Sequence, residues 1–502
     1  MVEPPSIDGE TVVFRWTQTE PNPYQYENSF YLRYEGIDLA RFAPPFFFEI
    51  FLGLQLKVFA AYGEPVEVVF PEPVPATTVA FWRTYHEAEH VTIGPIAPVA
   101  SYSPWRSGRA PEPGRKSIGV LFGGGKDSNL ATCLLAERYG ADEIVLFQLV
   151  SPFEPNADVA ERLEQRQEGL MLGPAREALG VATQRAWTDY LTQQHRCGFK
   201  VRPHLELYTV GLLPLALVWG VSLLSTSIAW TTYPIRRLAD GEVWFRFPKS
   251  RPESLATQST HYRRVIGADV TLTNTTLHFS TLTSYRVLAT RYPEAFARAV
   301  MCVRGRVGRR WCYQCPKCAD YARFGLACGM VDPRFDYDRL YAQSRPVLEL
   351  VHYVESGVER SVFGNVPWKR VVSERIRYLL DCHAYALISP GLIADRLGTE
   401  ALTNLLLLKA ALGNSTFPGF ESAPSQIADL LGHESAHWVA GIAAQYLDVV
   451  DVLPGPFLPD DPRFDYDFSI RMPTETELLD HIRGVEHEQR RHRTLASAST
   501  GG

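Results

Sequence analysis

The stretch SIGVLFGGGKDSNLATCLLAERYG, residues 117–140, has the pattern of a strand, a glycine-rich loop and a helix. Residues 117–122 are mostly apolar, which is typical of a short buried strand. Three glycines follow, and the apolar residues after them have helical spacing from about 128 to 139. A buried strand that turns directly into a helix indicates an α/β fold.

The chain after this stretch continues the α/β pattern. ADEIVLFQLV, residues 141–150, predicts the next strand, and the following residues up to 180 predict helix. Pro214 and Gly220 divide an uncharged stretch at 207–230 into a buried helix and a buried strand. We therefore predict a twisted parallel sheet, which binds ligands at the carboxyl ends of its strands. Both the glycine loop and STSIAWTT, residues 225–232, follow such strand ends.

The composition indicates an ordinary globular protein, with 46% hydrophobic and 21% charged residues. The net charge of −6 argues against binding to nucleic acid or to anionic membranes. The first residues, MVEPPSIDGE, lack the basic and apolar regions of a secretory signal. The stretch at 207–230 is long enough to span a bilayer, but it stands alone and lacks basic flanks. We expect a cytoplasmic protein with no nucleic-acid partner and no membrane partner.

The length of 502 residues exceeds the size at which a single core keeps growing, so we expect several domains. Strand-like and helix-like segments alternate before residue 100, whereas helical patterns dominate after 333. We predict an α+β N-terminal domain (1–100), a linker (101–116), an α/β domain (117–332), a mostly helical C-terminal region (333–490) and a disordered tail (491–502).

The loop after the first buried strand contains residue types that bind phosphate. Its members are Gly123, Gly124, Gly125, Lys126, Asp127 and Ser128. Consecutive glycines let backbone N–H groups approach an anion, and the positive end of the following helix points to the same place. Asp127 would repel phosphate unless a divalent cation lies between them, and Mg²⁺ suits that position. The alternative is a strand–turn–helix junction that uses glycine for its geometry alone.

A cysteine cluster lies in CVRGRVGRRWCYQCPKC, residues 302–318. Its members are Cys302, Cys312, Cys315 and Cys318. Cysteines in C-x-x-C pairs can bind one tetrahedral ion from a tight turn, so we predict a structural Zn²⁺ site. An iron–sulfur cluster and unligated thiols are the alternatives. Four thiolates leave no open position for water, so we assign the cluster no hydrolytic role.

The glycine loop differs from the Walker pattern and resembles the PP-loop of N-type ATP pyrophosphatases, S-G-G-x-D-S. Gly123 stands where that pattern has serine. The resemblance implies a fold like that of the adenine nucleotide alpha hydrolases, with ATP cleaved between its α- and β-phosphates. It also implies that Lys126 and the loop amides stabilise pyrophosphate, that Asp127 holds Mg²⁺, and that the substrate becomes adenylated.

The loop and the cysteine cluster together resemble 7-cyano-7-deazaguanine synthases, whose shorter domain begins at the loop. A closer resemblance is to the ATP-dependent UDP-N-acetylmuramoyl-L-alanyl-L-glutamate epimerases. That family has a similar N-terminal domain, the loop sequence GGGKDS and a W-C-x-x-C-P-K-C segment like Trp311–Cys318. HFSTL, residues 278–282, and the pair Phe420-Glu421 are similar to further segments of that family.

The resemblance implies an enzyme that adenylates a carboxylate and epimerises the α-carbon of a peptidyl amino acid. The terminal glutamate of UDP-MurNAc-L-Ala-L-Glu or a related peptide is the expected target. The expected partner is thus a small-molecule or nucleotide-linked peptide substrate with a carboxylate. Whether the protein forms a homo-oligomer is left open by the sequence. Residues 225–232 lack the Glu and Arg of the family's corresponding segment, so the ATP chemistry carries over better than the substrate.

Two other functions stay open: amide, nitrile or sulfur transfer to the activated group, and nucleotide sensing without catalysis. His261 and His278 are candidates for the general acid and base, because both lie between the second strand-end segment and the cysteines. A structural role for each is the alternative. With Lys126 and Asp127 they complete the predicted catalytic set.

Overall fold

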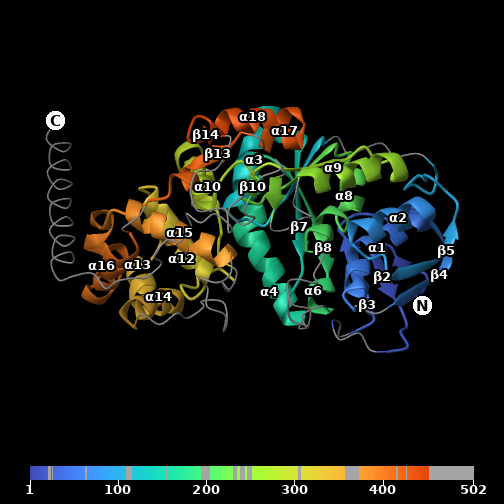
Figure 1. The fold of residues 1–502 in the computed structure, drawn as a ribbon, viewed down its shortest axis with the longest axis horizontal. Coiled ribbons are helices and arrows are strands. Elements are labelled where there is room, and N and C mark those ends of the chain that lie inside the picture. Colours follow the sequence, from blue (N-terminus) through green and yellow to red (C-terminus); the bar gives the residue numbers. More distant parts are fainter. Residues whose placement is uncertain are drawn as a thin grey trace. The chain divides into compact units, whose positions relative to one another are not determined.

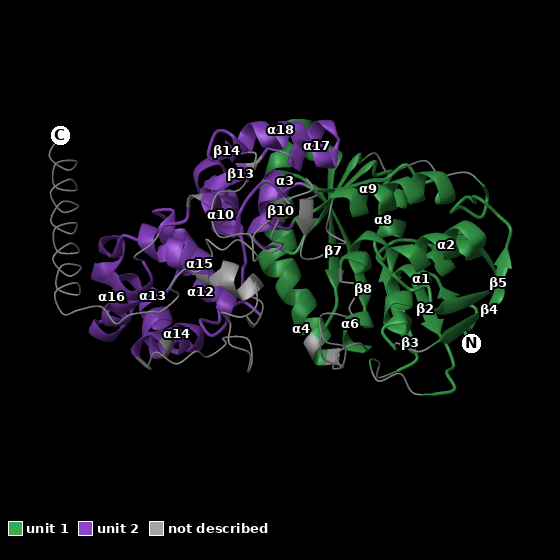
Figure 2. Cartoon of the chain, in the orientation of Figure 1, with its two compact units in different colours: residues 1–123, 134–227, 249–274 green, residues 124–133, 228–248, 275–502 purple. Residues whose placement is uncertain are grey.

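The computed structural model describes residues 1–450 except 21–23, 25–26, 63–64, 109–115, 153–156, 194–203, 230–234, 238–242, 246–251, 303–306, 357–371, 414–415 and 426. The end of the predicted helical region and the predicted tail at 491–502 lie outside the described residues. Two compact units make up the chain (Figure 2). The first contains residues 1–123, 134–227 and 249–274, and the second contains residues 124–133, 228–248 and 275–502.

An eight-stranded sheet in the order β1-β2-β3-β8-β7-β6-β9-β12 forms the centre of the first unit (Figure 1). The last five of these strands pair in parallel. They are β8 (Ala182–Thr188), β7 (Ile144–Val150), β6 (Ile118–Leu121), β9 (Leu223–Thr226) and β12 (Thr271–Asn274). Every residue of β6 and β7 is buried, as expected for strands that are covered on both faces. The predicted α/β fold with a parallel sheet is confirmed.

Three antiparallel strands from the N-terminal segment extend this sheet. They are β1 (Ser6–Asp8), β2 (Thr11–Arg15) and β3 (Ser29–Tyr34). β3 pairs with β8, with Leu32 opposite Thr188, so these strands do not form a sheet of their own. The boundaries of the two units therefore differ from the predicted domain boundaries, which stay a prediction about independent folding.

Helices join the parallel strands, and α3, α5 and α8 lie in segments that the sequence predicts to be helical. They are α3 (Lys126–Tyr139), α4 (Ala157–Gln167), α5 (Gly173–Leu179), α6 (Tyr190–Gln193), α7 (His204–Thr209), α8 (Leu213–Trp219) and α9 (Pro252–His261). Pro214 lies in the first turn of α8, and Gly220 ends it with a left-handed φ of 72°. The predicted division of the apolar stretch is thus confirmed. Among the described helices, none has the length and apolar character needed to cross a bilayer.

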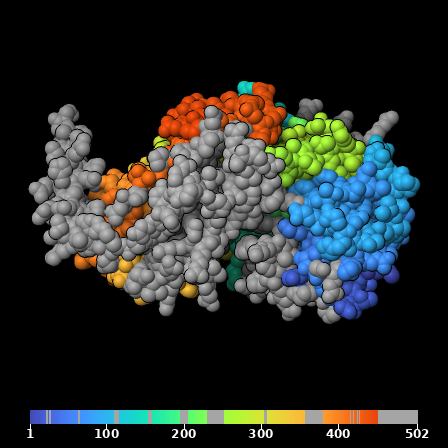
Figure 3. Space-filling model, in the orientation of Figure 1, coloured from blue at the N-terminus to red at the C-terminus, as the bar shows by residue number. Residues whose placement is uncertain are grey.

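The N-terminal segment also contains α1 (Pro44–Ala60), α2 (Ala76–Tyr85) and the parallel pair β4 (Val66–Pro75) and β5 (Val91–Ala97). Part of the predicted linker packs against it. The ring of Trp105 stacks on Phe42 at 4.7 Å between centroids, and the backbone N–H of Tyr102 donates to Val265 O at 2.8 Å. In Figure 3 the blue N-terminal residues adjoin the yellow-green residues of α9 on the surface of the first unit.

The second unit is mostly helical over its described residues. Its larger helices are α10 (Thr281–Arg291), α11 (Pro293–Arg298), α12 (Pro316–Ala327), α13 (Tyr337–Gln343), α14 (Arg345–Ser356), α15 (Val372–Leu387), α16 (Thr399–Leu412), α17 (Ile427–Leu431) and α18 (Glu434–Ala443). Two small sheets pair β10 (Ile235–Arg237) with β11 (Val243–Phe245) and β13 (Ser422–Pro424) with β14 (Asp448–Val450). Stacked aromatic rings, such as Phe296 and Tyr321 at 5.5 Å, fill the core around α12.

Candidate functional site

The glycine loop follows β6, the strand at which the winding direction of the parallel sheet reverses. Along the chain, β6, β7 and β8 follow one another toward one side of the sheet, whereas β9 and β12 lie on the other side of β6. The winding direction therefore reverses between β6 and β9. In open α/β sheets, ligands bind beyond the carboxyl ends of the strands at this reversal. The predicted loop follows β6 and the predicted segment 225–232 overlaps the end of β9, so both belong to this point.

The carbonyl groups of the loop are bonded to the protein. The backbone N–H of Val300 donates to Gly124 O at 2.8 Å. The side-chain amide of Asn129 donates to the carbonyl oxygens of Gly124 and Gly125 at 3.0 and 2.9 Å. Gly124 has a left-handed φ of 69°, which explains why this position needs glycine. Asn129 thus stabilises the loop through two hydrogen bonds, a role that the sequence pattern did not indicate.

Three backbone N–H groups of the same loop lack such partners among the described residues. Among the described residues, none accepts a hydrogen bond from the backbone N–H of Gly125, Asp127 or Ser128. A side-chain methyl built at Gly123 would meet no atom within 4 Å, so the space beside it is open. Several unpaired N–H groups at the start of a helix form an anion-binding site.

Lys126 and Asp127 form an ion pair at the beginning of α3. Lys126 Nζ lies 2.5 Å from Asp127 Oδ1 and 5.9 Å from the ring centroid of Tyr285. The lysine side chain is 8% exposed, whereas the aspartate side chain is 25% exposed. The carboxylate therefore remains accessible to a cation from solvent, while the ammonium group is held against the protein. Tyr285 is another neighbour that the sequence pattern did not indicate.

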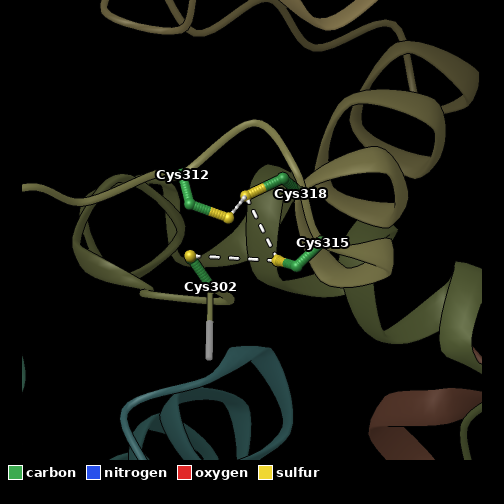
Figure 4. A group of neighbouring side chains, drawn as sticks. All are labelled: Cys302, Cys312, Cys315 and Cys318. Atoms are coloured by element: carbon green, nitrogen blue, oxygen red, sulfur yellow. Dashed lines mark hydrogen bonds between the residues drawn. The ribbon is translucent and has the colours of Figure 1, made fainter. Parts of the chain in front are cut away.

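The four predicted cysteine ligands come together in the second unit (Figure 4). Their sulfur atoms face one another, with Cys315 3.5 Å from Cys318 and 3.9 Å from Cys302, and Cys312 3.9 Å from Cys318. A tetrahedral ion with Zn–S bonds of ~2.3 Å places its sulfur ligands about 3.8 Å apart. The thiols are free rather than disulfide-bonded. The cluster can thus hold a metal ion such as zinc.

Local structure positions these cysteines. Cys315 is the N-cap of α12 and Pro316 occupies its first turn, so Cys318 faces back across one helical turn. Hydrogen bonds with Cys302 and Cys318 lower the pKa of Cys315 to about 6. A lowered pKa favours the thiolate, which is the form that binds metal. Tyr313, between the second and third cysteines, has a left-handed φ of 60°.

One short segment contacts both the loop and the metal-binding cluster. Val300 donates to Gly124, and the backbone N–H of Lys126 donates to Met301 Sδ at 3.1 Å. The next residue is Cys302, which belongs to the cluster. The cysteine cluster is therefore positioned to hold the inner side of the glycine loop in place. The sequence patterns of the two motifs do not indicate that they are connected, and none of them marks Met301 as a contact of the loop.

His261 lies in a closed polar cluster of the first unit. Its Nε2 is 2.6 Å from Glu49 Oε1, and its ring stacks on Phe81 at 3.7 Å. Thr78 and Trp82 also donate to the Glu49 carboxylate. Burial alone would raise the pKa of Glu49, but the neighbouring His261 lowers it, so the carboxylate stays charged. This arrangement favours a structural role for His261.

His278 has different surroundings in the second unit. It is 1% exposed, and its Nε2 has no hydrogen-bond partner among the described residues. Burial, together with the nearby His433 and His437, lowers the pKa of His278 to about 3. The imidazole is therefore neutral at pH 7, with an unused nitrogen. Among the described residues, neither predicted histidine bonds to Lys126 or Asp127, so the contacts join only two of the four predicted catalytic residues.

Two other predicted segments come together within the second unit. Ser280 Oγ donates to Phe420 O at 2.6 Å, which joins HFSTL to the Phe-Glu pair. Glu421 forms an ion pair with Arg286, and His383 Nε2 lies 3.6 Å from Glu421 Oε2. His383 and Arg286 lower the pKa of Glu421 to about 2. Arg286 and His383 had no signal in the sequence, because their partner is far away along the chain.

Neither a scan against models of protein families nor a search of curated proteins finds a match for this chain. The family resemblance therefore rests on the residues of the loop, the cysteine cluster and the two joined segments.

Proposed function

We propose that this protein cleaves ATP between the α- and β-phosphates and transfers AMP to a substrate carboxylate. The supporting observation is the glycine loop at the winding reversal, whose N–H groups at Gly125, Asp127 and Ser128 have no acceptor among the described residues. Phosphate oxygens match these donors in charge and number. The resemblance to the PP-loop supports an AMP-forming reaction over an ADP-forming one.

The residues present fit ATP with Mg²⁺. The quarter-exposed carboxylate of Asp127 is a hard oxygen ligand at the place where phosphate would otherwise be repelled. Lys126 supplies a positive charge beside it, and Mg²⁺, when bound, would neutralise charge on the phosphate oxygens. Together with the loop amides these groups stabilise pyrophosphate as it leaves.

The carboxylate that receives AMP belongs to a peptidyl amino acid, and the product is its α-carbon epimer. A free carboxylate makes the neighbouring Cα–H very hard to remove, because the resulting carbanion would lie beside a negative charge. Adenylation removes that charge and lets the carbanion form as an enolate-like oxyanion. An acid then returns a proton on the other face of the α-carbon, and water hydrolyses the acyl-adenylate to release AMP and the epimerised carboxylate. His278, one of the two histidines that the sequence indicates, is the candidate base, and its Nε2 has no hydrogen-bond partner among the described residues.

The test is incubation of the protein with ATP, Mg²⁺ and candidate peptides in D₂O. The proposal expects AMP, pyrophosphate and one deuterium at the α-carbon of the product. AMP together with a changed product mass but no deuterium at Cα would instead indicate amide, nitrile or sulfur transfer. The absence of AMP with every peptide would contradict the proposal.

A further inference from the structure

A cavity of 740 Å³ lies beside the cysteine cluster in the second unit. Its described lining is the run Gly308–Gln314, which includes Cys312, together with Arg339 from α13. Ligand pockets for small molecules typically measure about 300–1,000 Å³, so this cavity has room for a nucleotide-sized ligand. None of the described residues that line it belongs to the glycine loop.

The cavity concentrates positive charge in a protein whose net charge is −6. Arg309, Arg310 and Arg339 all line it. Within the described part of the chain, no carboxylate lies within 4.0 Å of any of these three guanidinium groups. Unpaired arginines around one cavity favour a ligand with two or more negative charges, and the guanidinium fork matches phosphate oxygens in particular.

Arg310 is already fixed in place on one side. It donates to the carbonyl oxygens of Ala297 and Ala299, the latter at 2.8 Å. Its Nε and the indole Nε1 of Trp311 are buried and have no partner among the described residues. Arg310 therefore contributes a guanidinium group of fixed position to the wall of the cavity.

Tyr313 gives the cavity a flat wall. The guanidinium carbon of Arg339 lies 5.0 Å from the centroid of its ring, and Phe335 packs against the ring at 5.1 Å. The backbone N–H of Asp336 donates to its hydroxyl group at 3.3 Å. Tyr313 keeps a left-handed φ of 60°, which is costly for an aromatic residue and often marks a ligand site. A planar ring can stack beside Tyr313 and Arg339.

We propose that this cavity binds a nucleoside diphosphate. Its phosphates would contact Arg309, Arg310 and Arg339, and its base would lie against Tyr313. The volume of 740 Å³ matches a single nucleotide rather than a nucleic-acid strand. The proposal stands independently of the adenylation reaction, because it uses no residue of the glycine loop.

The test is titration calorimetry of the zinc-loaded protein with GDP, at low and high salt. We expect one GDP per chain and weaker binding at high salt. Replacing both exposed arginines, Arg309→Gln with Arg339→Gln, should weaken binding by about tenfold or more. Arg263→Gln is the matched control, because this arginine is 55% exposed and lies in the first unit. It should leave binding unchanged.

The Lys126→Gln variant distinguishes GDP binding at this cavity from GDP binding at the glycine loop. It should leave GDP binding unchanged. Loss of GDP binding in Lys126→Gln but not in the double arginine variant would place the nucleotide at the loop and overturn the proposal. The proposal also fails if GDP does not bind at millimolar concentration, or if a single-stranded RNA binds more tightly than GDP through the same arginines.

Discussion

The glycine loop and the cysteine cluster are both turns that lead into a helix, but they differ in what they leave unsatisfied. The four sulfur atoms turn toward one another, and Cys302, Cys315 and Cys318 are each at most 1% exposed. The glycine loop instead directs its carbonyl groups inward and leaves N–H groups without described acceptors. A closed cluster suits a permanent ion, whereas an open loop suits a ligand that is exchanged in every turnover.

The segment Val300–Cys302 connects the two regions, because it bonds to Gly124 and Lys126 and ends in a metal-binding cysteine. Damage to the cluster should therefore reach the loop. Damage to the exposed side of the loop should leave the cluster intact.

Loss of the metal is expected to have the largest effect. Structural zinc sites contribute about 10–16 kcal/mol of apparent binding free energy, so Cys315→Ser should reduce metal content well below one ion per chain and lower the thermal midpoint strongly. It should also reduce AMP formation, because the loop loses its support. Metal analysis and calorimetry measure the first two effects. Unchanged metal content would remove Cys315 from the site.

Asp127→Asn is expected to affect activity alone. It removes the charge proposed to hold Mg²⁺, so AMP formation should fall by at least about 100-fold. The thermal midpoint and the metal content should stay those of the unsubstituted protein. Asp269→Asn, at an aspartate that is 82% exposed in the first unit, is the control. Full activity in Asp127→Asn would contradict its role.

Met301→Ala tests the connection between the regions. Truncating a buried methionine should cost about 2 kcal/mol or more, and the lost contact with Lys126 should also raise the KM for ATP several-fold. Met171→Ala is a matched control, because both methionines are 8% exposed. The Met171→Ala variant should have lower stability than the unsubstituted protein but the same KM for ATP. Equal KM changes in the two variants would show that Met301 has no special connection to the loop.

Burial of His278 should give a smaller effect, a loss of folding stability as the pH falls. Its folded-state pKa of about 3 lies below the ordinary value of 6.5, so the unfolded state binds more protons below pH 6.5. Stability should therefore fall as pH decreases in this window, by about 1 kcal/mol between pH 6.5 and pH 5.5. Urea unfolding at pH 6.5 and 5.5 measures this loss. His278→Gln should reduce the pH dependence by that amount, and an unchanged slope would refute the assignment.

Local patterns predicted the parts of the fold that depend on neighbouring residues. The strand, the loop and α3 follow directly from residues 117–140, and the spacing of the four cysteines at 302–318 predicted that they share an ion. Pairings across long sequence distances left no such signal. Glu49 lies in an apolar helix, and its partner His261 is 212 residues away. The pairing of β3 with β8 extended the sheet in a way that alternation within either strand could not indicate.

The most direct test of the account follows the α-phosphate of ATP. The protein, Mg²⁺ and ATP labelled at the α-phosphate are incubated with a peptide substrate, and the labelled products are separated. Scission at the position proposed here yields labelled AMP and unlabelled pyrophosphate, and Asp127→Asn abolishes both. Labelled ADP with orthophosphate as the second product would contradict the account.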